Sequence, residues 1–348
     1  MGKILEEDFR EIALSNFPHQ KLTNASFLIT GATGYLGSLL IRTLLYCNSF
    51  YDMNLRIIAQ IRDEKKAKAI LGESIEDPAL SFIKIDFCNQ AMINCDPVDY
   101  IIHTAAVTSS KTMIERPVET ILSSLNSTKA ILEYSVKSSP KSVVYISSME
   151  MYGEIHSEKK IAEEDIGYLD PLAVRSDYPE SKRLCENLCV AYHSEYGVKV
   201  KIARLAQMFG AGILPGENRV FAQFAKAVLE QKDIVLHTTG ESEGNYCYTS
   251  DAIRAILLIL MEGDDANAYN IVNEEMHSSI KDMARLVAEN IAEGRIKIVY
   301  DIPEKNLYGY APAVRMKLDS SKLRALGWEP AIGMVEAYQR MLIEMENK

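Results

Sequence analysis

The chain has 348 residues, of which 47% are hydrophobic and 25% charged, so it can bury a sizeable core in the way of an ordinary globular protein. Its formal net charge of −10 argues against a general affinity for nucleic acid, because phosphate binding needs a basic face. The acidic start lacks a secretory pattern, and the longest apolar run, 255–261, is too short to span a bilayer, so we expect a cytoplasmic protein with no membrane segment.

The first predicted element is a short amphipathic helix over about residues 5–15, which makes residues 1–20 an N-terminal extension. From Ser26 onward, short apolar runs alternate with helical stretches. The predicted strands are Phe27–Thr30, Leu55–Gln60, Phe82–Ile85, Tyr100–His103, Ser142–Ser147 and Lys199–Ala203. This rhythm predicts an α/β fold with a Rossmann-like, doubly wound parallel sheet.

The pattern loosens after Arg204 into loops rich in glycine and proline, which indicates a smaller α+β domain. A helix over about 219–230 belongs to it, whereas the helix 250–261 and the strand 268–272 are expected to return to the large domain. We therefore assign residues 21–205 and about 246–273 to a larger domain, which the glycine loop at residues 31–37 marks as the dinucleotide-binding one. Residues from about 206 to 245 and from 274 to 348 form a smaller domain, which is left as the predicted substrate domain.

A glycine loop follows the first strand and opens a helix that is predicted to run to about Cys47. Its first glycine, Gly31, allows a tight turn, Gly34 lets backbone amides approach a pyrophosphate, and Gly37 lets the helix pack closely on the strand. The pyrophosphate then lies at the positive end of the helix. The residues expected to contact the dinucleotide here are Gly31, Thr33, Gly34, Tyr35, Leu36 and Gly37.

The end of the second strand decides between NAD and NADP, because a carboxylate there binds the ribose hydroxyls while an arginine favours a 2′-phosphate. Arg62 stands at this position and favours NADP. Asp63 follows directly and is also within reach of the ribose, so both dinucleotides stay open at this point.

Tyr178 and Lys182 are four residues apart, so on a helix their side chains converge on one point. A tyrosine is a weak base at neutral pH, but a neighbouring ammonium favours the phenolate. Tyr178 can then take a proton from a substrate hydroxyl while hydride leaves for a nicotinamide. Helices also contain such pairs by chance, so the pair predicts redox chemistry at a hydroxyl group only together with the partner residues Ser148 and Asn126 and the segment Arg175–Arg183.

The Gly-x-x-Gly-x-x-Gly spacing together with Tyr178-x-x-x-Lys182 resembles the extended short-chain dehydrogenase/reductase family of NAD-dependent epimerases and dehydratases. The resemblance covers about residues 22–335, and the segment Arg175–Arg183 is similar to UDP-glucuronate decarboxylases. It implies a nucleotide-sugar substrate and a homodimer formed through the helices that carry Asn126 and Tyr178.

The resemblance also implies roles for further residues. Ser148, at the end of the fifth strand, would bond the reacting hydroxyl, and Asn126 would lie behind Lys182. The pair Asp86 and Phe87 would contact the adenine. Ala105 would line the dinucleotide.

Three positions depart from the relatives. Dehydratases carry an Asp-Glu pair where this chain has Met149 and Glu150, so only Glu150 is left as an acid or base, or else as a structural carboxylate at the strand end. The arginine of the decarboxylases aligns with Gly244, and an asparagine of the family is Gln207. The nucleotide-sugar pocket is therefore altered, or the substrate differs.

The sequence thus predicts an NAD(P)-dependent nucleotide-sugar epimerase that acts through a 4-keto intermediate. A dehydratase or decarboxylase of the same family, or an NADP-dependent carbonyl reductase, remains an alternative. Retention of Tyr178 and Lys182 argues against a dinucleotide sensor without catalysis. No histidine or cysteine has metal-ligand spacing, so no metal is expected.

Overall fold

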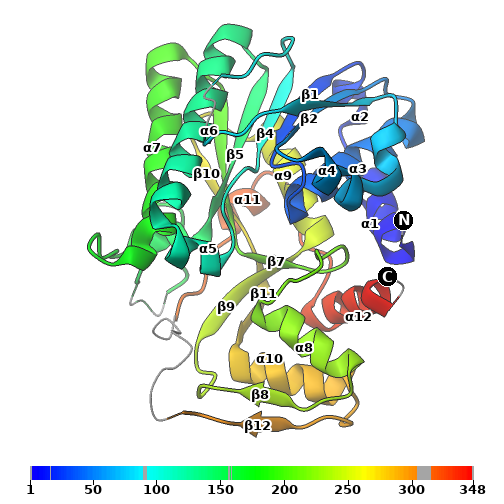
Figure 1. Ribbon diagram of the computed structural model, residues 1–348, viewed down its shortest axis with the longest axis vertical. Helices are drawn as coiled ribbons and strands as arrows, with labels where there is room; N and C mark the ends of the chain where they lie inside the picture. Colours follow the sequence, from blue (N-terminus) through cyan, green and yellow to red (C-terminus); the bar gives the residue numbers. More distant parts are fainter. Residues whose placement is uncertain are drawn as a thin grey trace.

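The computed structural model describes residues 2–15, 17–88, 92–155, 157, 159–303 and 315–346. Its larger lobe contains a seven-stranded sheet in the order β10-β6-β5-β4-β1-β2-β3, in which every neighbouring pair is parallel (Figure 1). The strands are β1 (Ser26–Thr30), β2 (Arg56–Ile61), β3 (Leu80–Lys84), β4 (Tyr100–His103), β5 (Ser142–Ser148), β6 (Val200–Leu205) and β10 (Ala268–Ile271). The predicted Rossmann-like α/β fold is confirmed.

Helices cover both faces of this sheet, which is why its central strands are apolar on both sides. Helices α6 (Pro117–Ser138) and α7 (Asp177–Tyr196) pack on one face, and α3 (Tyr35–Tyr51) and α9 (Thr249–Glu262) pack on the other. Helix α3 runs one turn beyond its predicted end. The remaining helices of the larger lobe are α2 (His19–Leu22), α4 (Glu64–Leu71), α5 (Ser110–Glu115) and α11 (Ser321–Arg324).

The N-terminal helix α1 (Lys3–Leu14) packs on α3 and α9, and the apolar side chains of Ile4, Phe9 and Ile12 join the core of the larger lobe. It also lies beside the C-terminal helix α12 (Met334–Glu346), so the two ends of the chain meet at one edge of the molecule (Figure 1). None of the described helices combines the length and apolarity needed to cross a membrane.

The smaller lobe has its own core around Phe209, Tyr246 and Tyr338. Its three-stranded sheet runs in the order β11-β9-β7, and β12 pairs with β8 in a separate parallel ladder. The elements are β7 (Gln207–Phe209), α8 (Val220–Leu229), β8 (Ile234–Leu236), β9 (Glu243–Tyr248), β11 (Asn273–Ser279), α10 (Ile280–Leu286), β12 (Ile298–Tyr300) and α12.

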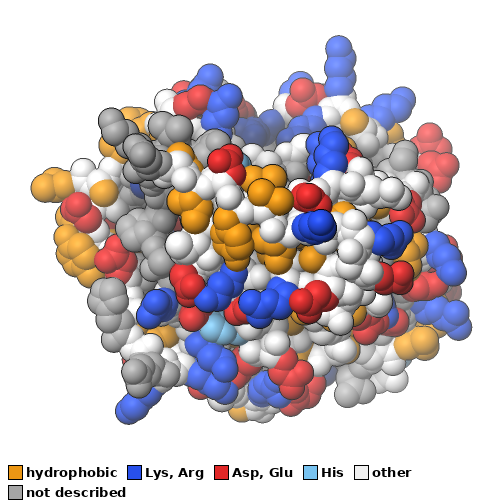
Figure 2. All heavy atoms as spheres, turned by 90° about the horizontal axis from the view of Figure 1, so that it is seen from below, with side chains coloured by type: hydrophobic (Ala, Val, Ile, Leu, Met, Phe, Trp, Pro, Cys, Tyr) orange, Lys and Arg blue, Asp and Glu red, His pale blue; other side chains and the backbone are white. Residues whose placement is uncertain are grey.

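The ladder of β8 and β12 at the end of the smaller lobe has apolar side chains exposed, whereas helices cover both faces of the large sheet. Figure 2 shows hydrophobic side chains gathered among charged ones at this end of the molecule. Strands β8 and β12 contribute the exposed side chains of Val235, Val299 and Tyr300. The two-stranded ladder therefore packs on the core of the smaller lobe with one face and leaves apolar side chains exposed on its other face.

Two details differ from the predicted division of the chain. The chain passes from the smaller to the larger lobe between β9 and α9, at Tyr248 and Thr249, so all of β9 lies in the small sheet. The side chains of Leu323 and Trp328 pack in the core of the larger lobe, although residues 274–348 were predicted to belong to the smaller domain. The Trp328 indole holds them there by donating to the carbonyl of Asp251, at 3.0 Å.

A buried ion pair fixes α7 against the sheet. Arg204 on β6 donates from Nε and Nη2 to the carboxylate of Glu186 on α7, at 2.8–3.2 Å, and both side chains are almost completely buried. Ser147 donates to the same carboxylate at 2.5 Å, and Tyr152 accepts from Arg204 at 3.0 Å. Every charge in this network is therefore matched, as burial requires.

We predict that Glu186→Gln lowers the free energy of unfolding by about 3 kcal/mol, because it leaves the guanidinium of Arg204 buried without its counter-charge. Urea denaturation measures this loss. The control is Glu133→Gln, which removes an exposed ion pair with Lys129 on α6 and should cost less than about 1 kcal/mol. Equal losses in the two variants would contradict the assigned role of Glu186.

Candidate active site

The glycine loop has the close approaches that a dinucleotide site needs. Gly31 has φ +66°, and a Cβ there would lie 2.9 Å from the backbone of Ala105. A Cβ on Gly37 would collide with the carbonyl oxygen of Gly31. Since both positions exclude a side chain, the first turn of α3 can present its backbone amides to a pyrophosphate. The loop therefore fits a dinucleotide.

Polar side chains tie the loop to neighbouring strands. Gln60 on β2 is 3% exposed, accepts from the amide of Gly31 at 3.0 Å and donates to the carbonyl of Ile85 at 2.5 Å. The amide of Ala105 donates to the hydroxyl of Thr30 at 3.3 Å. Sequence reasoning missed the role of Gln60, although an amide inside an otherwise apolar strand marks it.

Within the loop, Thr33 and Leu36 are partly exposed. The hydroxyl of Tyr35 lies 2.7 Å from the hydroxyl of Thr249 and donates to the carbonyl of Gly210 at 3.3 Å. Tyr35 therefore connects the glycine loop to the start of α9 and to the smaller lobe.

The residues predicted at the adenosine end occupy different environments. Arg62 is exposed just beyond β2. Asp63 caps α4 by accepting from the amides of Lys65 and Lys66, so its carboxylate already has local partners. Asp86 lies partly exposed beyond β3, whereas Phe87 is buried against Ile85 and Ala130.

Tyr178 lies in the first turn of α7, 6% exposed, beside Ser148 at the end of β5. Burial raises the pKa of Tyr178 above its ordinary value, and the negative charge of Glu150 raises it further. A hydrogen bond with Ser148 lowers that pKa, as do the positive charges of Arg175 and Arg219. The structure thus brings Ser148 and Tyr178 together.

Lys182 is 3% exposed and donates to the carbonyl of Ile146 at 2.8 Å. Its Nζ lies 4.9 Å from the centre of the Tyr145 ring and 5.7 Å from that of Tyr178. Burial lowers the pKa of Lys182 to about 8. The ammonium therefore lies between two aromatic rings, next to the predicted reacting centre.

Asn126 is partly buried on α6, but no hydrogen bond joins it to Lys182 in the described part of the chain. The role expected for Asn126 behind the lysine therefore stays a prediction. His103 also lies close, and burial together with the charge of Lys182 lowers the pKa of His103 to about 3. The neutral imidazole of His103 therefore forms a hydrogen bond of 2.6 Å with Thr30, which connects β4 to β1, the strand that precedes the glycine loop.

Glu150 is held in an ion pair with Arg175, whose Nη2 lies 2.9 Å from its carboxylate. Sequence reasoning did not assign Arg175 a role, although it is a cation one turn before Tyr178. Arg219, just before α8, is bonded to Glu217 at 2.6 Å. Lys226, on α8, lies 3.6 Å from Glu230 at the surface.

Gly244 on β9 is closed off by a neighbour. A Cβ at this position would lie 2.5 Å from the hydroxyl of the buried Tyr246, two residues along the strand. Gln207 on β7 pairs with the same Tyr246. An arginine at position 244 would therefore have to displace the phenol of Tyr246.

The described residues form no cluster of three or more metal-ligating side chains.

Comparison with known proteins finds a matching family and similar sequences for this chain. The model of the NAD dependent epimerase/dehydratase family matches residues 27–273. UDP-glucuronic acid decarboxylase 6 of Arabidopsis thaliana is 29% identical over 92% of this chain and 88% of its own.

Two solved structures share the fold. UDP-glucuronic acid 4-epimerase of Bacillus cereus, in complex with UDP-glucuronic acid and NAD, has a TM-score of 0.73 at 20% identity and covers 92% of this chain and 99% of its own. The dTDP-glucose 4,6-dehydratase of Streptomyces venezuelae, with NAD bound, has a TM-score of 0.74 at 22% identity and covers 93% and 97%.

The depressed pKa of Lys182 predicts a pH-dependent stability. Between about 8 and the ordinary 10.5, the folded chain has a neutral Lys182 while the unfolded chain has a charged one. Unfolding then takes up a proton, so stability rises with pH in this window. Relative to Lys182→Met, the wild type should gain up to about 1.4 kcal/mol per pH unit.

Urea denaturation of both proteins at pH 7, 8, 9 and 10 measures this difference. Lys129→Met, at an exposed lysine of α6, serves as the control and should keep a constant difference from the wild type. A constant difference for Lys182→Met would show that the ammonium is not desolvated.

Proposed function

The chain belongs to the NAD dependent epimerase/dehydratase family, and from this we propose that it epimerises a nucleotide-activated sugar at carbon 4. The observation that carries the proposal is the placement of Ser148, at the end of β5, next to Tyr178 in the first turn of α7, with Lys182 one turn further along that helix, at the carboxyl ends of the parallel strands. In a doubly wound sheet, this edge is where ligands bind. The glycine loop opens at the same edge, at the end of β1.

The chain's own residues handle the proton. The phenolate oxygen of Tyr178 accepts it from the sugar hydroxyl, and Ser148 holds that hydroxyl in line. Lys182, desolvated beside the Tyr178 ring, supplies the positive charge that favours this phenolate before the transfer. The dinucleotide, when bound, would supply the hydride acceptor and, once reduced, the hydride donor. After the 4-keto sugar turns in the site, Tyr178 returns the proton.

The residues around Tyr178 favour epimerisation over dehydration. Dehydration needs an acid for the leaving hydroxyl and a base for carbon 5. Met149 carries neither, and the one carboxylate at this position, Glu150, is engaged by Arg175. Epimerisation requires only Ser148, Tyr178, Lys182 and the dinucleotide.

Decarboxylation of a nucleotide-activated sugar acid is the second candidate. It is supported by the similarity to UDP-glucuronic acid decarboxylase 6 and by Arg175, whose charge acts on Tyr178. The 4-keto group would accept the electrons of the breaking bond between carbon 5 and the carboxylate, carbon dioxide would leave, and carbon 5 would take a proton. The closed position at Gly244 argues against it, because the cation of the decarboxylases is missing there.

We infer that the dinucleotide is NAD, in keeping with the family and with the solved relatives that contain it. Arg62 is the residue that favours NADP, since it stands exposed where a 2′-phosphate would lie. Comparison of the dissociation constants of NAD and NADP distinguishes the two.

We predict that Tyr178→Phe lowers kcat by at least about a hundredfold, because the proton acceptor is lost, and leaves the affinity for NAD unchanged. Proton NMR of UDP-glucose, UDP-N-acetylglucosamine and UDP-glucuronic acid incubated with the enzyme measures turnover. Tyr196→Phe, an exposed change at the end of the same helix, is the control.

The product identifies the reaction. A carbon-4 epimer supports the proposal, whereas a pentose and carbon dioxide show decarboxylation. Net consumption of NADPH would show a carbonyl reductase. Full activity of Tyr178→Phe on any substrate found would rule out the assigned role of Tyr178.

We further propose that the protein forms a homodimer through α6 and α7, which carry the exposed apolar side chains of Val118, Leu122 and Leu184. Light scattering should give the mass of a dimer for the wild type. The variant with both Leu122→Glu and Leu184→Glu should give that of a monomer, because buried unpaired carboxylates oppose association. A monomeric wild type would contradict this assignment.

A further inference from the structure

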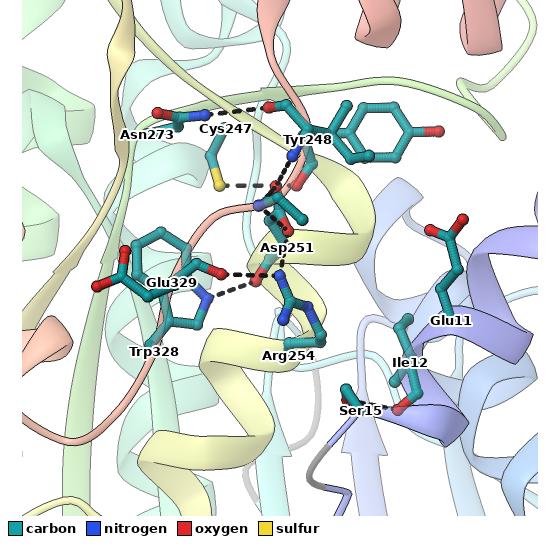
Figure 3. A network of polar contacts seen from close by, with 12 residues as sticks. Glu11, Ile12, Ser15, Cys247, Tyr248, Asp251, Arg254, Asn273, Trp328 and Glu329 are labelled. Carbon is teal, nitrogen blue, oxygen red and sulfur yellow. Dashed lines mark hydrogen bonds and ion pairs between the residues drawn. The ribbon is translucent and has the colours of Figure 1, made fainter.

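The crossing between the lobes is held by a buried tyrosine. Tyr248, the last residue of β9, is 0% exposed, and Thr249 begins α9 in the larger lobe. Figure 3 shows the Tyr248 ring extending from this crossing toward helix α1, which carries Glu11 and Ile12. Its hydroxyl donates to Oδ2 of Asp8 at 2.7 Å.

Asp8 lies on α1 and is 2% exposed. Its other carboxylate oxygen accepts from Arg340 of α12 at 2.6 Å. Burial raises the pKa of Asp8 to about 7 even though both partners donate to it. The carboxyl group is thus almost fully withdrawn from water, at the meeting point of α1, α12 and β9.

Helix α1 therefore has two kinds of attachment. Its apolar side chains Ile4, Phe9 and Ile12 lie in the core of the larger lobe. Asp8, on the same buried side one turn from Ile4 and from Ile12, and Glu11 at its edge bind Arg340 of α12, which belongs to the smaller lobe. The extension therefore bridges the lobes: apolar packing attaches it to the larger lobe, and bonds to Arg340 attach it to the smaller one.

The same crossing leads directly to the glycine loop. The hydroxyl of Thr249 lies 2.7 Å from the hydroxyl of Tyr35, at the start of α3. Two residues further, the carboxylate of Asp251 accepts from the amides of Ala331 and Ile332 at 3.0–3.1 Å. The start of α9 therefore contacts the glycine loop through Thr249, and it contacts the segment that leads into α12 through Asp251.

We propose that Asp8 is a positioning residue for the nucleotide sugar: through Tyr248 and Arg340 it sets the angle between the two lobes. The inference rests on the proposed function, because it requires the substrate to bind between the lobe that carries Tyr178 and the lobe that carries β9. Loss of Asp8 should misplace the sugar nucleotide while the glycine loop continues to bind the dinucleotide.

The test compares Asp8→Asn with Tyr248→Phe and with the double variant. Both single changes keep the shape of the side chain, and the apolar face of α1 still holds the helix in place. Glu7→Gln is the control, since Glu7 lies on the exposed side of α1 and pairs only with Lys3 among the described residues. Calorimetry measures binding of UDP and dTDP in saturating NAD, and separately binding of NAD.

We expect each single variant to bind the nucleoside diphosphate about tenfold more weakly, because a small misplacement of a binding group has a large effect. The double variant should be no weaker than either single one, since both break the same contact. Affinity for NAD should stay within about twofold of the wild type. Glu7→Gln should bind all ligands as the wild type does.

Unchanged nucleoside diphosphate binding in both single variants would overturn the inference and leave the proposed function standing. A parallel loss of NAD affinity would also overturn it, because it would show a general structural role. If the wild type binds NAD but neither UDP nor dTDP, the proposed function fails and the inference fails with it.

Discussion

The buried ion pair between Glu186 and Arg204 is the interaction on which the site depends. It joins α7 to β6, and α7 carries both Tyr178 and Lys182. Glu186 follows Lys182 by one helical turn, so the pair sets where the lysine meets the end of β5. The bond from Lys182 to the carbonyl of Ile146 then fixes the ammonium next to Tyr178. The packing of α7 on the sheet therefore also determines where the reacting groups lie.

Burial has opposite consequences for the two reacting groups. It raises the pKa of Tyr178 and lowers that of Lys182 to about 8, so before ligands bind the phenol is neutral at neutral pH while the lysine keeps most of its positive charge. Charges around the site then act in opposite directions, since Glu150 opposes the phenolate while Arg175 and Arg219 favour it. Because Arg175 is bonded to Glu150, a substrate anion that draws Arg175 away would change both influences on Tyr178.

The elements that rest on local patterns could be predicted from sequence. The glycine spacing, the strand that precedes it and the helical separation of Tyr178 and Lys182 are encoded within a few residues each, and the parallel sheet followed from the alternation of strands and helices. The contacts that sequence did not show connect distant segments: Glu150 with Arg175, Gln60 with Gly31, and Asp8 with Tyr248. The carbonyl behind Lys182 was equally hidden, because a backbone partner leaves no residue signature.

In the proposed reaction, hydride leaves carbon 4 of a sugar and returns to the same carbon. A nucleotide sugar that carries deuterium at carbon 4, once identified as a substrate, tests this directly by NMR of the product. The product is expected to keep its deuterium at carbon 4 in ordinary water, with no net change in the dinucleotide. Loss of the label to solvent would contradict it, because the carbon–hydrogen bond would then have been broken as a proton transfer.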